Sequence, residues 1–253
     1  MKKNNTVFHM GSYIDAMKQM AALICVCIVA LALMEYVVAC AFAPDFEFVP
    51  VRIEQILFPV ALVYIVVSPA LVMYLFRYQY SRGGSDCYHA LPIQRKRVFI
   101  SYSAAILTVD VLFVMIGGIL AEMCVYAANG GFDVRIDNSS YYIKIGWYVA
   151  ASIYTMATML LSLSISGTRF MSLCFYALLF LPLLKMMSVW REKNVYGLLY
   201  PLLFGVLFWA IACVLDEKRP SETAGHSVAP GTSYVVMAGL LFAAAYVWIV
   251  QRS

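Results

Sequence analysis

Long apolar runs recur along almost the whole chain, and they restrict the fold more than any other feature. Hydrophobic residues make up 63% of the sequence and charged residues only 13%, a composition far from that of soluble domains. A bilayer core about 30 Å thick is crossed by roughly 20 apolar residues in a helix. The sequence therefore predicts an all-α, polytopic membrane protein with apolar runs at residues 21–42, 56–76, 98–126, 147–166, 171–187, 198–215 and 234–250.

Lysine and arginine set the expected orientation, because positively charged loops resist translocation. With the N-terminus inside, eleven of the eighteen basic residues lie on the cytoplasmic side, and the outer loops are residues 43–55, 127–146 and 188–197. The expected organisation is a cytoplasmic or interfacial N-terminal helix (1–20), a six-span domain (21–215) containing a cytoplasmic loop (77–97), a cytoplasmic linker (216–232) and a seventh apolar segment (233–253).

The segment before the first span has a helical pattern of its own. Tyr13, Met17 and Met20 fall on one side of a helix over residues 9–20, which suits an interfacial helix lying on the membrane. A plain extension of the first span fits the same residues, and the sequence leaves both interpretations open.

Motifs for catalysis or metal binding are absent from the sequence. There is no phosphate-binding G-x-x-x-x-G-K-[ST] loop, no nucleophile elbow and no H-E-x-x-H pair. The cysteines lie mostly in apolar runs and the three histidines form no ligand cluster, while Ser162, Ser164 and Ser166 are interpreted as helix-packing residues. We expect no catalytic residue, no metal, no bound cofactor and no nucleic-acid partner for this chain.

The cytoplasmic loop at residues 77–97 is the segment best suited to a partner protein. Gly83 and Gly84 predict a flexible break, Ser85 or Asp86 predicts a helix cap, and Pro92 ends the resulting short helix. On that helix an aromatic and an aliphatic side chain share one face and can enter a groove of the partner. The basic residues 95–97 that follow are interpreted chiefly as topology signals.

The loop sequence SDCYHALPIQRKRVF resembles the D-x-Y-H-S-L-P-I-x-R pattern in the membrane subunits of bacterial type 2 ABC exporters, with Ala90 in place of the usual serine. Two later stretches are similar to the same permeases. Residues 165–182 resemble their tight T-G turn and the apolar helix after it, and residues 218–229 resemble their R-x-S-E-x-A-G segment. The three stretches and the spans between them cover most of the chain.

This resemblance implies a permease subunit of an ATP-driven exporter in the bacterial inner membrane, working as a homo- or heterodimer on a hydrophobic or peptide-like substrate. A separate cytoplasmic ATPase would bind ATP and magnesium. The resemblance assigns coupling to the ATPase to Asp86, Tyr88, His89, Leu91, Pro92 and Arg95. It assigns a possible second cytoplasmic contact to Arg219, Ser221, Glu222 and Gly225. Family members are usually longer, so we expect either a short member or a truncated product.

Ionisable residues inside the apolar runs are candidates for a translocation path, because a charge in hydrocarbon is costly unless it faces protein or water. Counting about 1.5 Å per helical residue places Asp110 near mid-membrane, where it is the best candidate for a pathway or dimer-interface group. A hydrogen bond to a neighbouring serine or tyrosine would also satisfy it. Glu35 and Lys185 lie at similar depth and could therefore pair. For these two residues a structural bridge or a snorkelling lysine is favoured over a contact with substrate, and Glu122 lies near the outer boundary.

Two other functions stay open. One is a non-transporting scaffold or sensor subunit with a permease-like fold. The other is a membrane-embedded enzyme, which requires Glu35, Asp110 or Glu122 to converge on a reacting group.

Overall fold

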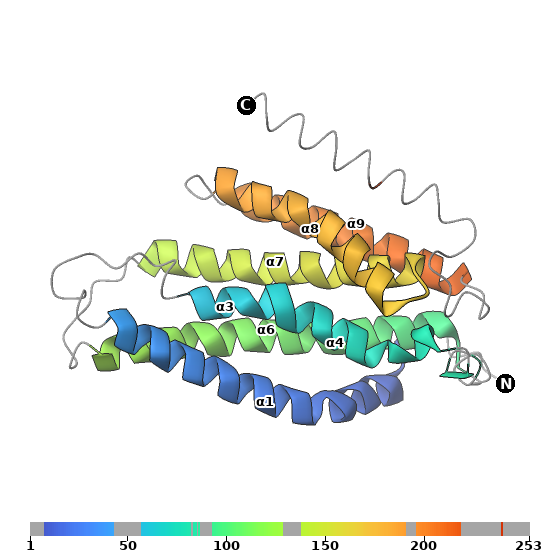
Figure 1. The fold of residues 1–253 in the computed structure, drawn as a ribbon, viewed down its shortest axis with the longest axis horizontal. Coiled ribbons are helices and arrows are strands. Elements are labelled where there is room, and N and C mark those ends of the chain that lie inside the picture. Colours follow the sequence, from blue (N-terminus) through green and yellow to red (C-terminus); the bar gives the residue numbers. More distant parts are fainter. Residues whose placement is uncertain are drawn as a thin grey trace.

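The computed structural model describes residues 8–42, 57–81, 83–84, 86, 93–128, 138–190, 196–218 and 239. Its regular elements in these ranges are all helical and lie side by side in one bundle (Figure 1). The long helices are α1 (Met10–Phe42), α6 (Arg95–Ala128), α7 (Asn138–Ile165), α8 (Arg169–Trp190) and α9 (Tyr196–Lys218). The second apolar run is divided into α3 (Phe58–Leu62), the π-helix η2 (Val63–Val67) and α4 (Ser68–Leu75), followed by the 3-10 turn η3 (Arg77–Tyr80).

Five of the described helices are long and apolar enough to cross a membrane: Met10–Val38, Phe58–Leu75, Arg95–Cys124, Tyr141–Ile165 and Leu198–Glu217. This confirms the all-α class and the membrane-spanning character predicted from the apolar runs. The apolar helix of the fifth run, Arg169–Leu181, is shorter than these five. The predicted seventh segment lies, apart from Gly239, outside the described residues.

The second predicted outer loop, residues 127–146, is wrong in its second half. Helix α7 already begins at Asn138, because residues 141–145 are apolar except for Lys144. Lys144 is half-buried there, and a helix tolerates such a lysine because the aliphatic stem can lie along apolar neighbours with the ammonium group near the surface.

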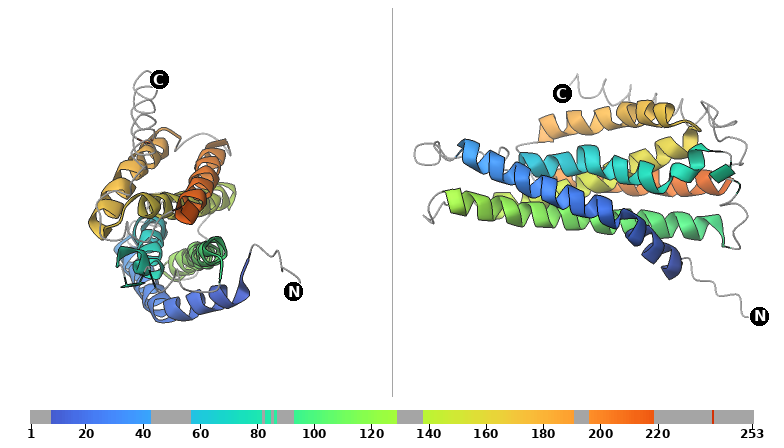
Figure 2. Two further views of the ribbon diagram at one scale, coloured as in Figure 1. Left: turned by 90° about the vertical axis from the view of Figure 1, so that its right-hand side faces the viewer. Right: turned by 60° about the horizontal axis from the view of Figure 1, so that its bottom comes forward.

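Helix α1 is continuous from Met10 through the first span, so the segment before that span extends it. Its first turns bend away from the axis of the rest (Figure 2) and are bonded to α6. The backbone N–H of His9 donates to Ser101 Oγ at 3.0 Å, and the Tyr13 hydroxyl donates to Thr108 Oγ1 at 3.3 Å. Helices α1 and α6 therefore start at the same end of the bundle, where α4 finishes at Leu75; this is called the loop end below.

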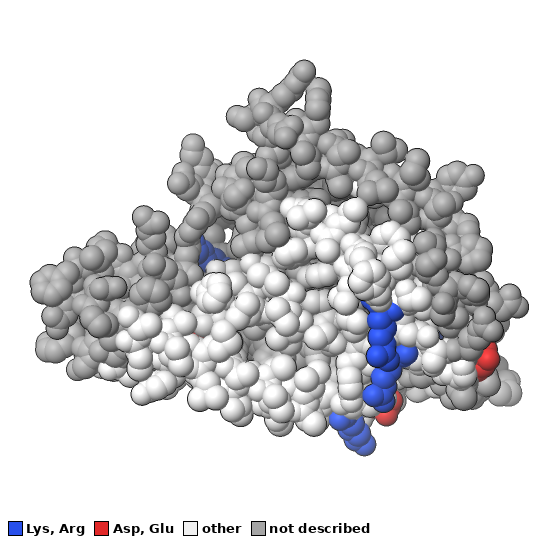
Figure 3. Space-filling model, in the orientation of Figure 1, with Lys and Arg blue, Asp and Glu red and all other residues white. Residues whose placement is uncertain are grey.

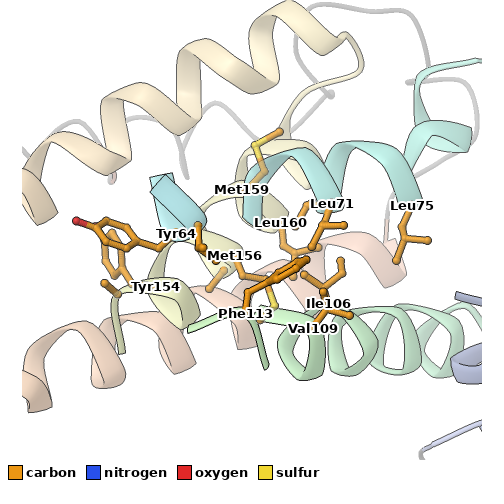
Figure 4. Close-up of a cluster of buried hydrophobic side chains, with 14 of the residues drawn as sticks. Tyr64, Leu71, Leu75, Ile106, Val109, Phe113, Tyr154, Met156, Met159 and Leu160 are labelled. Atoms are coloured by element: carbon orange, nitrogen blue, oxygen red, sulfur yellow. The ribbon is translucent and has the colours of Figure 1, made fainter. Parts of the chain in front are cut away.

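Helix α7 lies in the middle of the bundle, between α3–α4 and α6 on one side and α8 and α9 on the other (Figure 1). Its contacts with α4 and α6 form an apolar core in which Leu71, Ile106 and Leu160 are fully buried (Figure 4). Ser162 and Ser166 donate to backbone carbonyls four residues earlier, at 2.7 and 2.8 Å. The interpretation of the α7 serines as packing residues is thereby confirmed, because small hydroxyls that bond their own helix allow close helix contact.

Gly205 allows α9 to approach α7 closely, and we expect Gly205→Ala to destabilise the protein. A Cβ at this position would lie 3.2 Å from both Cα and N of Tyr154, and backbone atoms cannot move aside cheaply. We expect a loss of about 1–3 kcal/mol of unfolding free energy, seen as a lower melting temperature in detergent. Gly146→Ala is the matched control, because its Cβ would meet only Leu198 Cδ1 at 3.5 Å. An equal effect of both changes would contradict this explanation.

Candidate functional site

The chain leaves α4 through a turn that is packed against α6. The ring of Phe76 lies 5.4 Å from that of Phe99 and 5.8 Å from that of Tyr102, between centroids. Phe76 is fully buried, and both partner rings belong to the first turns of α6. The chain therefore leaves the second span from a fixed position.

A buried hydrogen bond ties this turn to α9. Gln79 Nε2 donates to Asp216 Oδ1 at 2.6 Å, across 137 positions of sequence, and the two residues are only 5% and 7% exposed. A carboxylate is costly to bury without donors, and a hydrogen bond to a charged acceptor is roughly twice as strong as a neutral one. Gln79 therefore joins η3 firmly to the end of the last described span.

A second tether joins the same turn to the start of α8. The Tyr80 hydroxyl donates to Ser172 Oγ at 3.2 Å, and the Arg169 guanidinium carbon lies 5.7 Å from the centre of the Tyr80 ring. Ser172 also bonds Ser166, which lies just before the turn into α8. One short segment, η3, thus contacts the beginning of α8 and the end of α9.

Helix α6 begins on the other side of the predicted loop with a weaker link to α9. Lys96 Nζ lies 4.0 Å from Glu217 Oε2, and the two side chains are 49% and 56% exposed. Ion pairs this exposed contribute about 0–1 kcal/mol. Each side of the loop thus has a link to α9, and the buried Gln79–Asp216 bond is stronger than the exposed Lys96–Glu217 pair.

The structure covers part of the predicted coupling set. Asp86 is helical and exposed, and Arg95 is half-buried at the start of α6. Tyr88, His89, Leu91 and Pro92 lie outside the described residues. So do Arg219, Ser221, Glu222 and Gly225, the predicted second contact. These assignments stay predictions.

The predicted cap of the loop helix is wrong. Gly83 and Gly84 are already helical, and Ser81 Oγ accepts the Gly84 backbone N–H at 3.3 Å. Ser81 has φ −120° and ψ 135°, the extended geometry of an N-cap residue. The cap is therefore Ser81, in place of Ser85 or Asp86, and the two glycines belong to the helix start.

Asp110 is fully buried between α4 and α6. Ser68 Oγ donates to Asp110 Oδ2 at 2.7 Å, while Oδ1 has no hydrogen-bond partner. An orphaned acceptor at membrane depth costs free energy. The structure places Asp110 inside the bundle, where the Ser68 hydroxyl satisfies one carboxylate oxygen, and the role of Asp110 in a pathway stays a prediction.

The backbone beside Asp110 is irregular. Ser68 follows the π-helix η2, where an extra residue in the turn rotates the following residues, and Pro69 has no N–H to offer the Ile65 carbonyl four residues earlier. The Tyr176 hydroxyl from α8 donates to that carbonyl at 3.3 Å. The second span, at the junction of η2 and α4, therefore meets α6 and α8 at a polar point with irregular backbone near the middle of the spans.

Glu35 on α1 is a further buried carboxylate, 1% exposed, and its Oε1 has no hydrogen-bond partner in the described part of the chain. The predicted partner Lys185 belongs to α8, and the structure does not describe its side chain. Helices α1 and α8 lie on opposite sides of the bundle (Figures 1 and 2), which argues against the pair. Nor do Glu35 and Asp110 converge, since Glu35 interacts electrostatically with Cys124 and Tyr141, and Cys124 lies about 21 Å beyond Asp110 along α6 at about 1.5 Å per residue.

The chain was compared with family models, curated proteins and solved structures, and no match was found. Within the described part of the chain no group of three His, Cys, Asp or Glu residues could hold a metal ion. Fold and hydropathy define the class directly: this is a helical membrane protein whose described helices include five candidate spans.

Proposed function

We propose that this chain is the permease subunit of an ATP-driven transporter, an exporter in the bacterial inner membrane whose ATP is hydrolysed by a separate cytoplasmic subunit. The observation that carries the proposal is the attachment of η3, at the entrance to the loop, to α9 through Gln79–Asp216 and to α8 through Tyr80–Ser172. An exposed docking helix is useful only if its movement reaches the spans, and these contacts supply that connection.

The proposed mechanism passes movement from the loop to the bundle. The partner ATPase binds residues 86–92, and closure of the ATPase on ATP displaces the loop. Because η3 is continuous with α4 and bonded to α8 and α9, these three spans move together. Arg95 carries the same movement into α6 on the other side.

The proposed path for a hydrophobic or peptide-like substrate passes the polar point at Asp110. Three of the helices that the loop would move, α4, α6 and α8, meet there. A displacement of α8 against α4 would alter the Tyr176–Ile65 contact and the surroundings of the unpaired Asp110 oxygen. In this proposal, movement of the loop therefore changes the helix contacts around Asp110.

Replacing Tyr88 and Leu91 together with alanine should abolish association with the partner ATPase, because these two side chains provide the apolar face of the proposed docking helix. The measurement is copurification of the chain with a P-loop ATPase encoded beside it. Leu203→Ala, which removes a 67% exposed side chain on α9, is the control and should leave association intact. Intact association and transport in the double variant would refute the coupling role.

A further inference from the structure

A cavity of about 660 Å³ opens at the loop end, beside the two tethers. Its volume lies within the roughly 300–1,000 Å³ typical of small-molecule sites. Its lining residues come from η3, from the start of the loop and from the first residue of α8, and they are Arg77, Tyr78, Tyr80, Ser81, Gly84 and Arg169. The charged groups among them are two guanidinium groups, with no carboxylate.

Both guanidinium groups lie over aromatic rings and have no acidic partner among the residues that the structure describes. The Arg77 guanidinium carbon lies 5.0 Å from the centre of the Tyr74 ring, and that of Arg169 lies 5.7 Å from the centre of the Tyr80 ring. Among the described residues neither has a carboxylate within 4.0 Å. Two arginines that share a cavity without an acid favour an anion, and planar guanidinium groups match phosphate oxygens in geometry.

The cavity also lies at the level expected for lipid headgroups. Arg77 comes two residues after the span Phe58–Leu75, and Arg169 begins the apolar helix Arg169–Leu181. Basic residues directly beyond apolar helices sit at the membrane surface. Figure 3 shows a short column of Lys and Arg atoms on the side turned to the viewer in Figure 1, with Asp or Glu atoms at its lower end and broad uncharged surface beside it.

An apolar stripe runs along α8 from this basic site. Leu173, Ala177 and Leu181 follow Arg169 at intervals of four residues and are all exposed, so they share one face of the helix. A phosphate held at Arg77 and Arg169 would place an attached acyl chain along these side chains. A basic head followed by an apolar stripe matches the two parts of a phospholipid.

We infer that this cavity binds the phosphate of an anionic membrane phospholipid, whose acyl chain lies along the exposed face of α8. The bound lipid contacts η3 and α8 together and so reinforces the tether between them. This site does not depend on the proposed ATPase partnership, because it rests only on the cavity, its arginines and the α8 surface.

Phosphatidylglycerol titrated into the purified chain in phosphatidylcholine nanodiscs tests the site through the melting temperature. Arg77→Gln and Arg169→Gln should each raise about fivefold the phosphatidylglycerol concentration needed for half of the melting-temperature shift. The double variant should raise it about 25-fold. Lys18→Gln removes an exposed basic residue that does not line the cavity, and this control should retain the full effect. An equal loss in the control would mean general surface attraction and would overturn the site.

Two further measurements separate the lipid from a free anion and do not require the variants to fold. Native mass spectrometry of the unaltered chain should retain phosphatidylglycerol in preference to phosphatidylcholine. Inorganic phosphate at matched concentration should leave the melting temperature of the unaltered chain unchanged, because it lacks the acyl chain. Stabilisation by inorganic phosphate alone, or equal retention of the two lipids, would refute the assignment.

Discussion

Replacing Gln79 with leucine should both destabilise the protein and disconnect the entrance of the loop from α9. The change removes the amide that donates to the buried Asp216 carboxylate, so a charged acceptor that is only 7% exposed loses a donor. We expect the unfolding free energy to fall by about 2–3 kcal/mol. In a complex with its ATPase, the variant should continue to hydrolyse ATP while transport falls at least about tenfold, because η3 no longer holds α9.

Lys96→Gln is the matched control for this prediction. It also removes a link between a loop-flanking segment and α9, but the Lys96–Glu217 pair is exposed and should contribute no more than about 1 kcal/mol. A double-mutant cycle with Gln79→Leu and Asp216→Leu should give a coupling energy of about 2 kcal/mol. Equal effects of the Lys96 and Gln79 changes, or zero coupling in the cycle, would rule out the buried bond as the main tether.

The spans could be predicted from the sequence because bilayer thickness fixes the length of an apolar helix. The apolar runs at 98–126 and 198–215 correspond to α6 and α9, each a few residues longer than its run. The start of α7 could not be predicted, because Lys144 looks like a loop residue until its stem has a helix to pack against. The π-helix before Pro69 could not be predicted either, since hydropathy carries no information about the hydrogen-bonding pattern of a helix.

The tethers of the loop could not be predicted because they join residues that are far apart in sequence. Gln79 looks like one polar residue among several in a basic segment, and Asp216 looks like the polar end of a span. Only the packing of η3 against α8 and α9 brings Gln79 to Asp216 and Tyr80 to Ser172. Asp110 could be chosen as a candidate residue from the sequence, because a carboxylate within an apolar run is unusual whatever its neighbours are.

Asp110→Asn should reduce transport by about tenfold or more while leaving the fold and the ATPase association intact. The asparagine carbonyl still accepts the Ser68 hydrogen bond, so the unfolding free energy should change by no more than about 1 kcal/mol. What the variant loses is the acidic group at the point where α4, α6 and α8 meet. A tenfold loss corresponds to about 1.4 kcal/mol, a modest effect for removing an ionisable group from a membrane-buried path.

Two variants separate a role in transport from a role in folding. Ser68→Ala removes the donor to Asp110 Oδ2 and should lower the unfolding free energy by about 1–3 kcal/mol, because it leaves a buried acceptor unpaired. Thr158→Val removes a buried hydroxyl that bonds only a carbonyl of its own helix, and it should leave transport unchanged. If Asp110→Asn transports normally and is instead markedly less stable, Asp110 is a structural acceptor for Ser68, and the path must run elsewhere in the bundle.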